Sequence, residues 1–140
     1  MARVEVDHSF RSSSAQVFAY MAEHENLATV LGARVTRVRD GSDGVRNGVG
    51  STRRVKVALL PAFEESVTEF QPHQLIRYRM SHNSLIGSVV TDHEGVMRFS
   101  VTAIGGTRLQ YVIIFHARIP GLAPVAARLL QTRRPLVWLR

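Results

Sequence analysis

Cysteine is absent from this 140-residue sequence. Without it the protein has no disulfide framework, no thiolate metal site and no thiol nucleophile. The absence also suits a reducing compartment, so we expect a cytoplasmic protein. The chain is long enough to do without cross-links, because a domain of this size buries roughly 70% of its unfolded surface when it folds.

Long apolar runs are absent as well. No stretch reaches the roughly 20 consecutive apolar residues that span a bilayer. The first residues alternate between apolar and polar side chains from the start, which predicts a strand rather than a signal peptide. No repeat, low-complexity tract or composition shift divides the sequence. We therefore expect a single domain over residues 1–140.

Acidic residues are scarce relative to basic ones. The chain has 11 Asp and Glu against 18 Lys and Arg, for a net charge of +7, and nearly all of the positive charge is arginine. Such an excess of positive charge can favour the binding of nucleic acid, an anionic membrane or an acidic ligand. The arginines are spread along the chain, however, and many alternate with apolar residues, which is typical of solvated sheet faces. We expect no specific nucleic-acid partner and leave peripheral contact with an anionic membrane open.

The N-terminal part predicts a strand followed by short helices. In residues 3–10, apolar side chains and His8 occupy every second position. Ser13 and Gln16 have the spacing of a capping box, and an apolar face follows in residues 14–24, which predicts a helix there. Residues 25–31 predict a second short helical segment that ends at Gly32.

Strands and turns dominate the middle of the chain. The glycine-rich segment 41–50 and the prolines at 61 and 72 mark turns, and Gly105-Gly106 marks a hairpin. A bend is expected at Gly95. Alternating patterns predict six further strands, at 34–40, 51–59, 62–70, 74–81, 89–103 and 107–118.

A long helix is predicted at the C-terminal end. Pro124 suits the first turn of a helix, whereas Pro135 should kink or end it because proline lacks the backbone donor. One face of this helix carries Leu122, Val125, Leu129, Leu136 and Leu139.

The order of elements predicts an α+β fold. No strand–helix–strand alternation occurs, so the sheet should be antiparallel. We expect a seven-stranded curved antiparallel sheet wrapped around the long C-terminal helix, with one or two short helices after the first strand. A bent sheet closed by one helix leaves a space that is either packed shut or kept open for a ligand.

Several local strings resemble the START-like superfamily, also called Bet v 1-like or SRPBCC, and within it the bacterial polyketide cyclase/dehydrase branch. The chain departs from the family pattern at Ser14, where a proline is usual, and at Pro135 inside the last helix. The resemblance implies the helix-grip fold and a cavity for lipids, polyketides or other apolar molecules. The matching strings are Ser14–Ala22, His24–Leu27, Gly48–Val55, Phe63–Pro72, Asp92–Gly95 and Gly105–Leu109.

Strand parity selects the residues that should face the interior. Arg53 and Glu65 lie on neighbouring strands, where an inward Arg–Glu pair would satisfy both charges. Either the pair compensates only itself, or one strand is shifted and both side chains face water, or Arg53 binds a carboxylate, phenolate or keto oxygen while Glu65 fixes its orientation. The predicted ligand-binding residues are Arg53, Val55, Val57, Glu65, Val67, Tyr78, Met80, His93, Met97, Phe99, Tyr111, Ile113, Phe115 and Leu129.

His93 is a weak candidate for a general base, and no catalytic residue is assigned. It shares a face with Met97, Phe99 and Val101 if no bulge intervenes, and its ordinary pKa lies near working pH. A histidine beside a turn is more often a structural hydrogen-bond partner. No other histidine has metal-ligand spacing, so we expect no metal and no cofactor.

Three functions remain open from the sequence. The first, which we favour, is a non-enzymatic binder or carrier of an apolar small molecule with one polar group. The second is a cyclase or dehydratase with an acid/base group inside the cavity. The third is a binder of anionic membrane or nucleic acid through the basic exterior.

Overall fold

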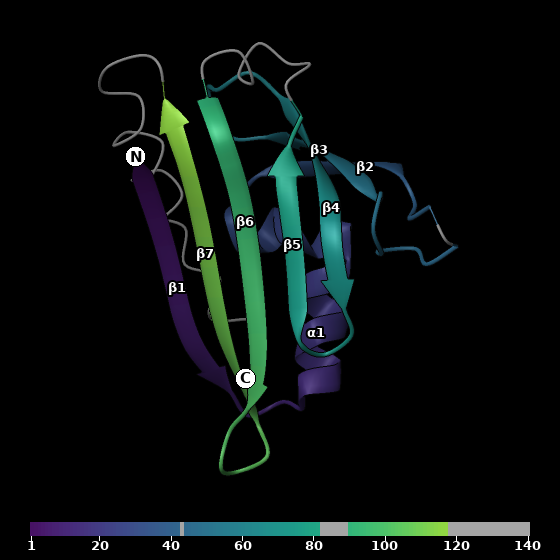
Figure 1. Cartoon of the computed structure of the whole chain (residues 1–140), viewed down its shortest axis with the longest axis vertical. Coiled ribbons are helices and arrows are strands. Elements are labelled where there is room, and N and C mark those ends of the chain that lie inside the picture. Colours follow the sequence, from purple (N-terminus) through teal and green to yellow (C-terminus); the bar gives the residue numbers. More distant parts are fainter. Residues whose placement is uncertain (43, 82–89, 118–140) are drawn as a thin grey trace.

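The computed structural model describes residues 1–42, 44–81 and 90–117. Their strands form one antiparallel seven-stranded sheet, as predicted, and the strand order within it is β1-β7-β6-β5-β4-β3-β2 (Figure 1). The two end strands of this order, β1 and β2, come first and second along the chain. The strands are β1 (Ala2–Phe10), β2 (Arg34–Arg39), β3 (Thr52–Lys56), β4 (Phe63–Gln71), β5 (Leu75–Met80), β6 (Val90–Val101) and β7 (Thr107–Ala117).

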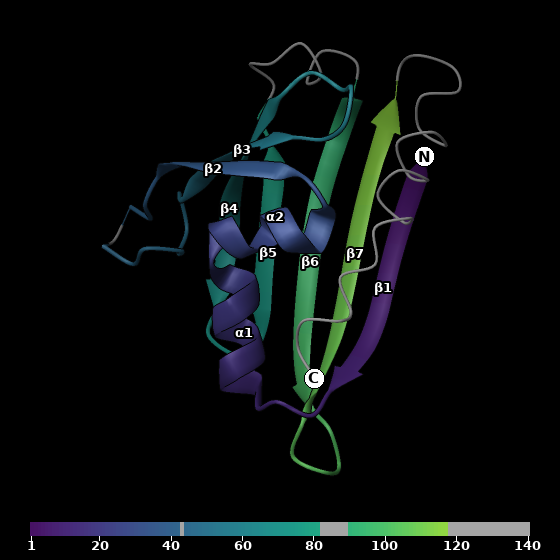
Figure 2. The same cartoon turned by 180° about the vertical axis from the view of Figure 1, so that it is seen from behind.

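The helical segments cover one face of the sheet, which we call the inner face (Figure 2). They are α1 (Ser14–Ala22), a 3₁₀ turn η1 (His24–Asn26) and α2 (Leu27–Leu31). The predicted capping box is present, because the Ser13 side chain accepts from the Gln16 backbone and the Gln16 side chain accepts from the Ser13 backbone. α2 ends at Gly32, whose φ of 60° is a left-handed conformation that suits glycine.

Phe18 fixes α1 on the sheet. Its ring centroid lies 5.3 Å from that of Phe70 on β4 and 5.0 Å from that of Phe99 on β6, both in edge-to-face geometry. Val17 and Met21 are buried beside it. Replacing a buried phenylalanine by alanine typically costs about 3–5 kcal/mol, so this contact contributes strongly to holding the helix on the inner face.

Register shifts bend the sheet. One lies between Arg37 and Arg39 on β2, and another lies between Thr91 and Glu94 on β6. In both views β2 runs across the direction of β6 and β7 (Figures 1 and 2). The inner face is therefore curved, as expected of a sheet with bulges.

The irregularity in β6 is not at Gly95, where a bend was predicted. It lies at Asp92 and His93, and Asp92 adopts a φ of 54°. Gly95 instead makes room for Tyr78, because a Cβ atom at Gly95 would lie 2.0 Å from Cζ of the tyrosine ring. The glycine therefore marks a close side-chain approach rather than a bend.

Two apolar residues near the ends of predicted strands are exposed. β3 ends at Lys56, and Leu59 beyond it is 99% exposed. Val101, at the end of β6, is 69% exposed. Alternation fails at Leu59 because β3 ends before the pattern does, and at Val101 because it is the last residue of β6.

The predicted C-terminal helix, with Leu129 and Pro135, lies outside the described residues. Within the described part of the chain, no helix has the length and apolar character needed to cross a membrane.

Candidate functional site

The inner face holds a buried ion pair between β3 and β4. Arg53 on β3 lies directly opposite Glu65 on β4, and Arg53 Nη2 donates to Glu65 Oε2 at 3.0 Å. The two side chains are 2% and 3% exposed. The inward Arg–Glu pair expected from strand parity is therefore present. Because both charges are buried away from water, each is tolerated only while the opposite charge of its partner compensates it.

Arg53 also joins the sheet to the helical layer. Its Nη1 lies 3.0 Å from Nδ1 of His24 in η1. Its guanidinium lies over the Tyr78 ring, 4.4 Å from the centroid, in cation–π geometry. The Tyr78 hydroxyl is in turn hydrogen-bonded to the Tyr111 hydroxyl on β7. Arg53, Glu65, His24, Tyr78 and Tyr111 form one buried polar cluster, which we call the inner cluster.

The protonation state of His24 follows from its surroundings. Burial, followed by the nearby charge of Arg53, lowers the pKa of His24 to about 3, so the ring is neutral at pH 7. An arginine only donates, so Nδ1 of His24 must accept its hydrogen bond. The hydrogen of the neutral ring is then on Nε2.

The two tyrosines of the inner cluster remain protonated. Burial raises the pKa of Tyr78 well above its ordinary value, and the Tyr111 hydroxyl adds to this effect. Burial also raises the pKa of Tyr111. Both hydroxyls therefore keep their hydrogens at pH 7 and can act as donors.

Three buried polar atoms have no hydrogen-bond partner among the described residues. They are Nε2 of His24, Nε of Arg53 and Nδ1 of His93. Each such group costs about 1–3 kcal/mol if nothing satisfies it. Buried polar atoms are nearly always paired, so three unpaired ones in this region call for an explanation.

His93 lies at the bulge in β6 and faces a small pocket. Its ring centroid lies 5.9 Å from that of Tyr78 and 6.4 Å from that of Phe63. Burial lowers the pKa of His93, so the ring is neutral at pH 7. The last described β5–β6 pair is Arg79 with Glu94. Beside that pair is a pocket of about 180 Å³, lined by Arg79, Met80, Val90, Asp92, His93, Glu94 and Ile114.

Most of the predicted ligand-binding residues are buried on the inner face. Only Met80 and His93 of that set line the pocket, and Met80 is partly buried. Leu129 lies outside the described residues. The fully buried members are Arg53, Val55, Val57, Glu65, Val67, Tyr78, Met97, Phe99, Tyr111, Ile113 and Phe115.

His24 is the site residue that the sequence analysis missed. Strand parity cannot find it, because it lies in a 3₁₀ turn. A usable signal was present, since Val17, Met21 and His24 follow the i, i+4, i+7 spacing of one helical face. Extending the α1 pattern by one turn would have placed His24 on the buried side.

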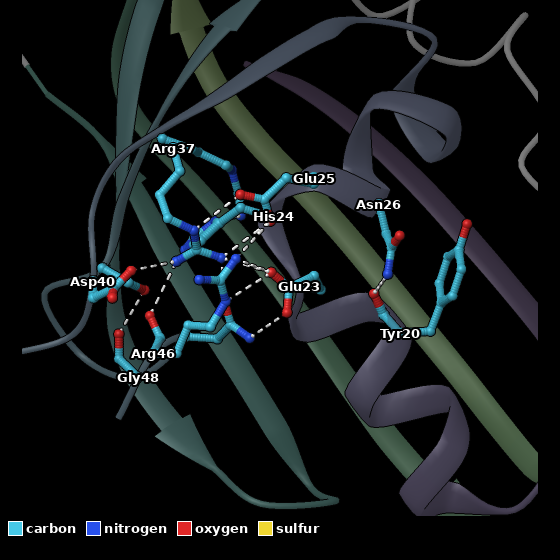
Figure 3. A network of polar contacts seen from close by, with 12 residues as sticks. Tyr20, Glu23, His24, Glu25, Asn26, Arg37, Asp40, Arg46 and Gly48 are labelled. Atoms are coloured by element: carbon cyan, nitrogen blue, oxygen red, sulfur yellow. Dashed lines mark hydrogen bonds and ion pairs between the residues drawn. The ribbon is translucent and has the colours of Figure 1, made fainter. Parts of the chain in front are cut away.

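A second polar network lies beside the inner cluster (Figure 3). Arg37 is directly opposite Arg53 in the sheet, and its side chain is only 13% exposed, which corrects the expectation of a solvated arginine there. It donates to Glu23 at 2.9 Å and to Glu25 at 2.9 Å, while Arg46 donates to Glu23 at 2.8 Å. These contacts attach β2 and the loop after it to the junction between α1 and η1.

The carboxylate of Glu23 is the hub of this network. Hydrogen bonding from Arg46 lowers the pKa of Glu23 to about 2. No group of three or more His, Cys, Asp or Glu residues that could hold a metal ion occurs in the described ranges.

Comparison with known proteins identifies the class. The fold is that of the START-like, SRPBCC-type proteins, as the resemblance predicted. Residues 1–134 match the sequence model of the family described as polyketide cyclase / dehydrase and lipid transport, and the chain belongs to this family. No curated protein sequence matches the chain.

Several solved structures share the fold. DR_A0006 from Deinococcus radiodurans is 13% identical with a TM-score of 0.65, over 95% of this chain and 91% of that one. A point mutant of norcoclaurine synthase from Thalictrum flavum, in complex with a transition-state analogue, is 12% identical with a TM-score of 0.61, over 94% and 92%. The Aha1 dimer from Colwellia psychrerythraea is 14% identical with a TM-score of 0.59, over 94% and 87%. At these identities the similarity establishes the fold alone.

Proposed function

We propose that this protein binds an apolar small molecule carrying at least one polar atom, and that the polar atom meets the inner cluster. The observation that carries the proposal is the set of three buried atoms, on His24, Arg53 and His93, that have no hydrogen-bond partner in the described part of the chain. A bound molecule would supply the missing hydrogen-bond partners. It would also recover the free energy that burying these groups costs.

The surroundings of the inner cluster support an apolar ligand. Val67, Met97 and Ile113 are buried on the same face and offer no polar atoms. Ligand sites generally combine such an apolar lining with a few convergent polar groups. Membership of a family described by lipid transport and polyketide chemistry agrees with this combination.

We assign the pocket beside His93 the role of entrance. Its volume of about 180 Å³ is below the roughly 300–1,000 Å³ of typical small-molecule sites, so it would hold only one end of a ligand. His93 connects it to the interior, because its ring lies against Tyr78 of the inner cluster. A ligand entering here would meet His93 before Arg53.

Binding can be tested with the neutral fluorescent probe N-phenylnaphthylamine. We expect its emission to rise on addition of the protein, and His93→Leu to change its affinity by severalfold. His116→Leu is the matched control, because His116 is exposed on β7 and does not line the pocket. Native mass spectrometry of freshly purified protein should reveal a copurifying apolar molecule. Absence of both probe binding and a copurifying molecule would refute the proposal.

A second candidate function is a cyclase or dehydratase, and the position of His93 favours it. Its neutral ring lines the pocket, has an Nδ1 with no hydrogen-bond partner in residues 1–42, 44–81 and 90–117, and lies beside Tyr78, a protonated phenol. A neutral imidazole can accept a proton, and a phenol can donate to an enolate oxygen. Under this function His93→Gln would abolish turnover of a β-polyketone substrate while retaining its binding. Under the first function no turnover would occur with the parent protein either.

A further inference from the structure

The loop between β3 and β4 carries the most exposed large apolar side chain of the described residues. Residues 57–62 read Val-Ala-Leu-Leu-Pro-Ala, with no polar side chain among them. Val57 is buried, whereas Leu59 in the turn is 99% exposed. A leucine side chain gains free energy when it leaves water, so this position favours contact with an apolar medium.

Hydrogen bonds hold the β3–β4 loop in a fixed shape. The Leu60 backbone donates to the Val57 carbonyl at 2.9 Å, which closes a turn. Nζ of Lys56 donates to the Ala58 carbonyl at 2.9 Å and also to the Leu60 carbonyl. Ala58 has a φ of 43°, a left-handed conformation that is unfavourable for a residue with a side chain. The loop therefore presents Leu59 to the outside in a conformation that Lys56 helps to maintain.

The bonds from Lys56 suit a loop that leaves water. Backbone carbonyls that enter an apolar medium need hydrogen-bond partners within the protein, because no water is there to supply them. Lys56 supplies one to each of two carbonyls of the loop, and Pro61 has no N–H to satisfy. An ammonium group has three hydrogens, so a third can be donated to a lipid phosphate.

Basic side chains surround the loop on the outer face of the sheet. Arg34 on β2 lies directly opposite Lys56, and Arg54 shares this face because it lies two positions before Lys56 on β3. Glu64 on β4, opposite Arg54, is an acidic neighbour. These four side chains together carry a net positive charge, which favours anionic headgroups.

We infer that the β3–β4 loop docks on the surface of an anionic lipid bilayer, with Leu59 among the lipids and Lys56 and Arg34 at the headgroups. A stable protein partner would need a patch of about 800 Å², whereas lipids adapt to one protruding leucine. Such docking is reversible, because one apolar side chain with a few cations gives weak membrane binding. It would also bring the pocket beside His93 to the membrane, since the ring centroid of Phe63, directly after the loop, lies 6.4 Å from that of His93.

A dye attached at the loop tests where the protein meets the bilayer. The chain has no cysteine, so Leu59→Cys creates a single site for a nitrobenzoxadiazole dye. We expect its emission to rise severalfold and shift to shorter wavelength with vesicles of equimolar phosphatidylcholine and phosphatidylglycerol. Ile104→Cys is the matched control and should not respond, because Ile104 is 82% exposed in the β6–β7 turn, at the other end of β6 (Figures 1 and 2). Equal responses at the two positions overturn the inference.

Vesicle sedimentation of the full chain gives an independent readout. Leu59→Asn should weaken binding to the same vesicles about tenfold or more, because it removes the apolar contact. Arg34→Gln should weaken binding about fivefold, the factor that one cation near an anionic surface contributes. Ile104→Asn and Arg11→Gln are the matched controls and should bind as the parent does, since Arg11 follows the end of β1 that pairs with Thr107 after the β6–β7 turn.

Three results of the sedimentation assay would overturn the inference. They are the absence of vesicle binding, equal binding to vesicles of phosphatidylcholine alone, and binding that Leu59→Asn leaves unchanged. A concentration-dependent dimer that Leu59→Asn abolishes would also overturn it, because the loop would then be a contact between two copies of the chain. An unchanged melting temperature confirms that the variant is folded, as expected for a fully exposed position. No assay here contains a pocket ligand, so the outcome is independent of N-phenylnaphthylamine binding.

Discussion

Replacing Arg53 by Met and Glu65 by Leu, singly and together, measures how strongly the two buried charges depend on each other. Each single change leaves one charge in a site where the partner side chains are 2% and 3% exposed. Breaking a buried pair in this way typically costs about 3–5 kcal/mol, because the remaining charge is neither solvated nor compensated. We expect each single variant to lose about that much of its free energy of unfolding.

The double variant should be far more stable than the sum of the two losses implies. Replacing a buried pair by apolar residues of similar volume is often neutral or stabilising. Loss of Arg53 also leaves Nδ1 of His24 without its donor, at a cost of about 1–3 kcal/mol. We therefore expect the double variant within about 2 kcal/mol of the parent, which gives a coupling energy of about 4 kcal/mol or more.

Urea unfolding at pH 7, followed by far-ultraviolet circular dichroism, measures all four free energies by linear extrapolation. The matched control is the pair of Arg108 and Asp7 between β7 and β1, whose side chains are 49% and 52% exposed. Exposed pairs of this kind couple by only about 0.2–1 kcal/mol. If the Arg53 and Glu65 losses were simply additive, the reasoning about a mutually dependent buried pair would be refuted.

Three further predictions concern neighbouring residues. The pKa of His24 is about 3 when folded and about 6.5 when unfolded, so the unfolded state binds more protons between these values. The contribution of His24 to stability should fall by about 2 kcal/mol from pH 7 to pH 5, so a His24→Gln variant should lose less stability than the parent over this range, by about that amount, in urea titrations. The carboxyl of Glu23 titrates at about 2 when folded against 4.5 ordinarily, so its stabilising effect should be full above pH 4.5 and lost as pH falls toward 2. Solvent screening limits that effect to roughly 1 kcal/mol, and Glu23→Gln should remove it whereas Glu5→Gln, in an exposed pair with Arg3, should not. Gly95→Ala should cost about 1–3 kcal/mol in thermal unfolding because its Cβ would collide with the Tyr78 ring, and an unchanged melting temperature would contradict that packing.

Local chemistry made most of the fold predictable. The alternation of apolar and polar residues identified the strands, because a strand with one buried face places an apolar side chain at every second position. The capping box at Ser13 and the left-handed glycine at Gly32 fixed the helix boundaries within a few residues. Burial departed from the pattern at strand ends, since Leu59 lies beyond β3 and Val101 is the last residue of β6. Gly95 was misassigned because a glycine that bends a strand and one that admits a ring look alike in sequence.

The candidate site was predictable only in part. Parity brought Arg53, Glu65 and Tyr78 to the inner face, because it depends only on position along a strand. It could not reveal that His24 receives a hydrogen bond from Arg53, since the two residues belong to different layers and are 29 positions apart. Nor could it place Arg37 in a carboxylate network formed by the α1–η1 junction.

The sequence by itself determined the order of strands and helices, the face that each strand buries and the family to which the chain belongs. Those properties depend on neighbouring residues and on repeating patterns, and both are visible within short segments of the sequence. Only the tertiary structure decided which buried polar atoms find partners and which remain unpaired. That outcome depends on distances between layers, and a hydrogen bond responds to changes of a few tenths of an ångström that no local pattern encodes.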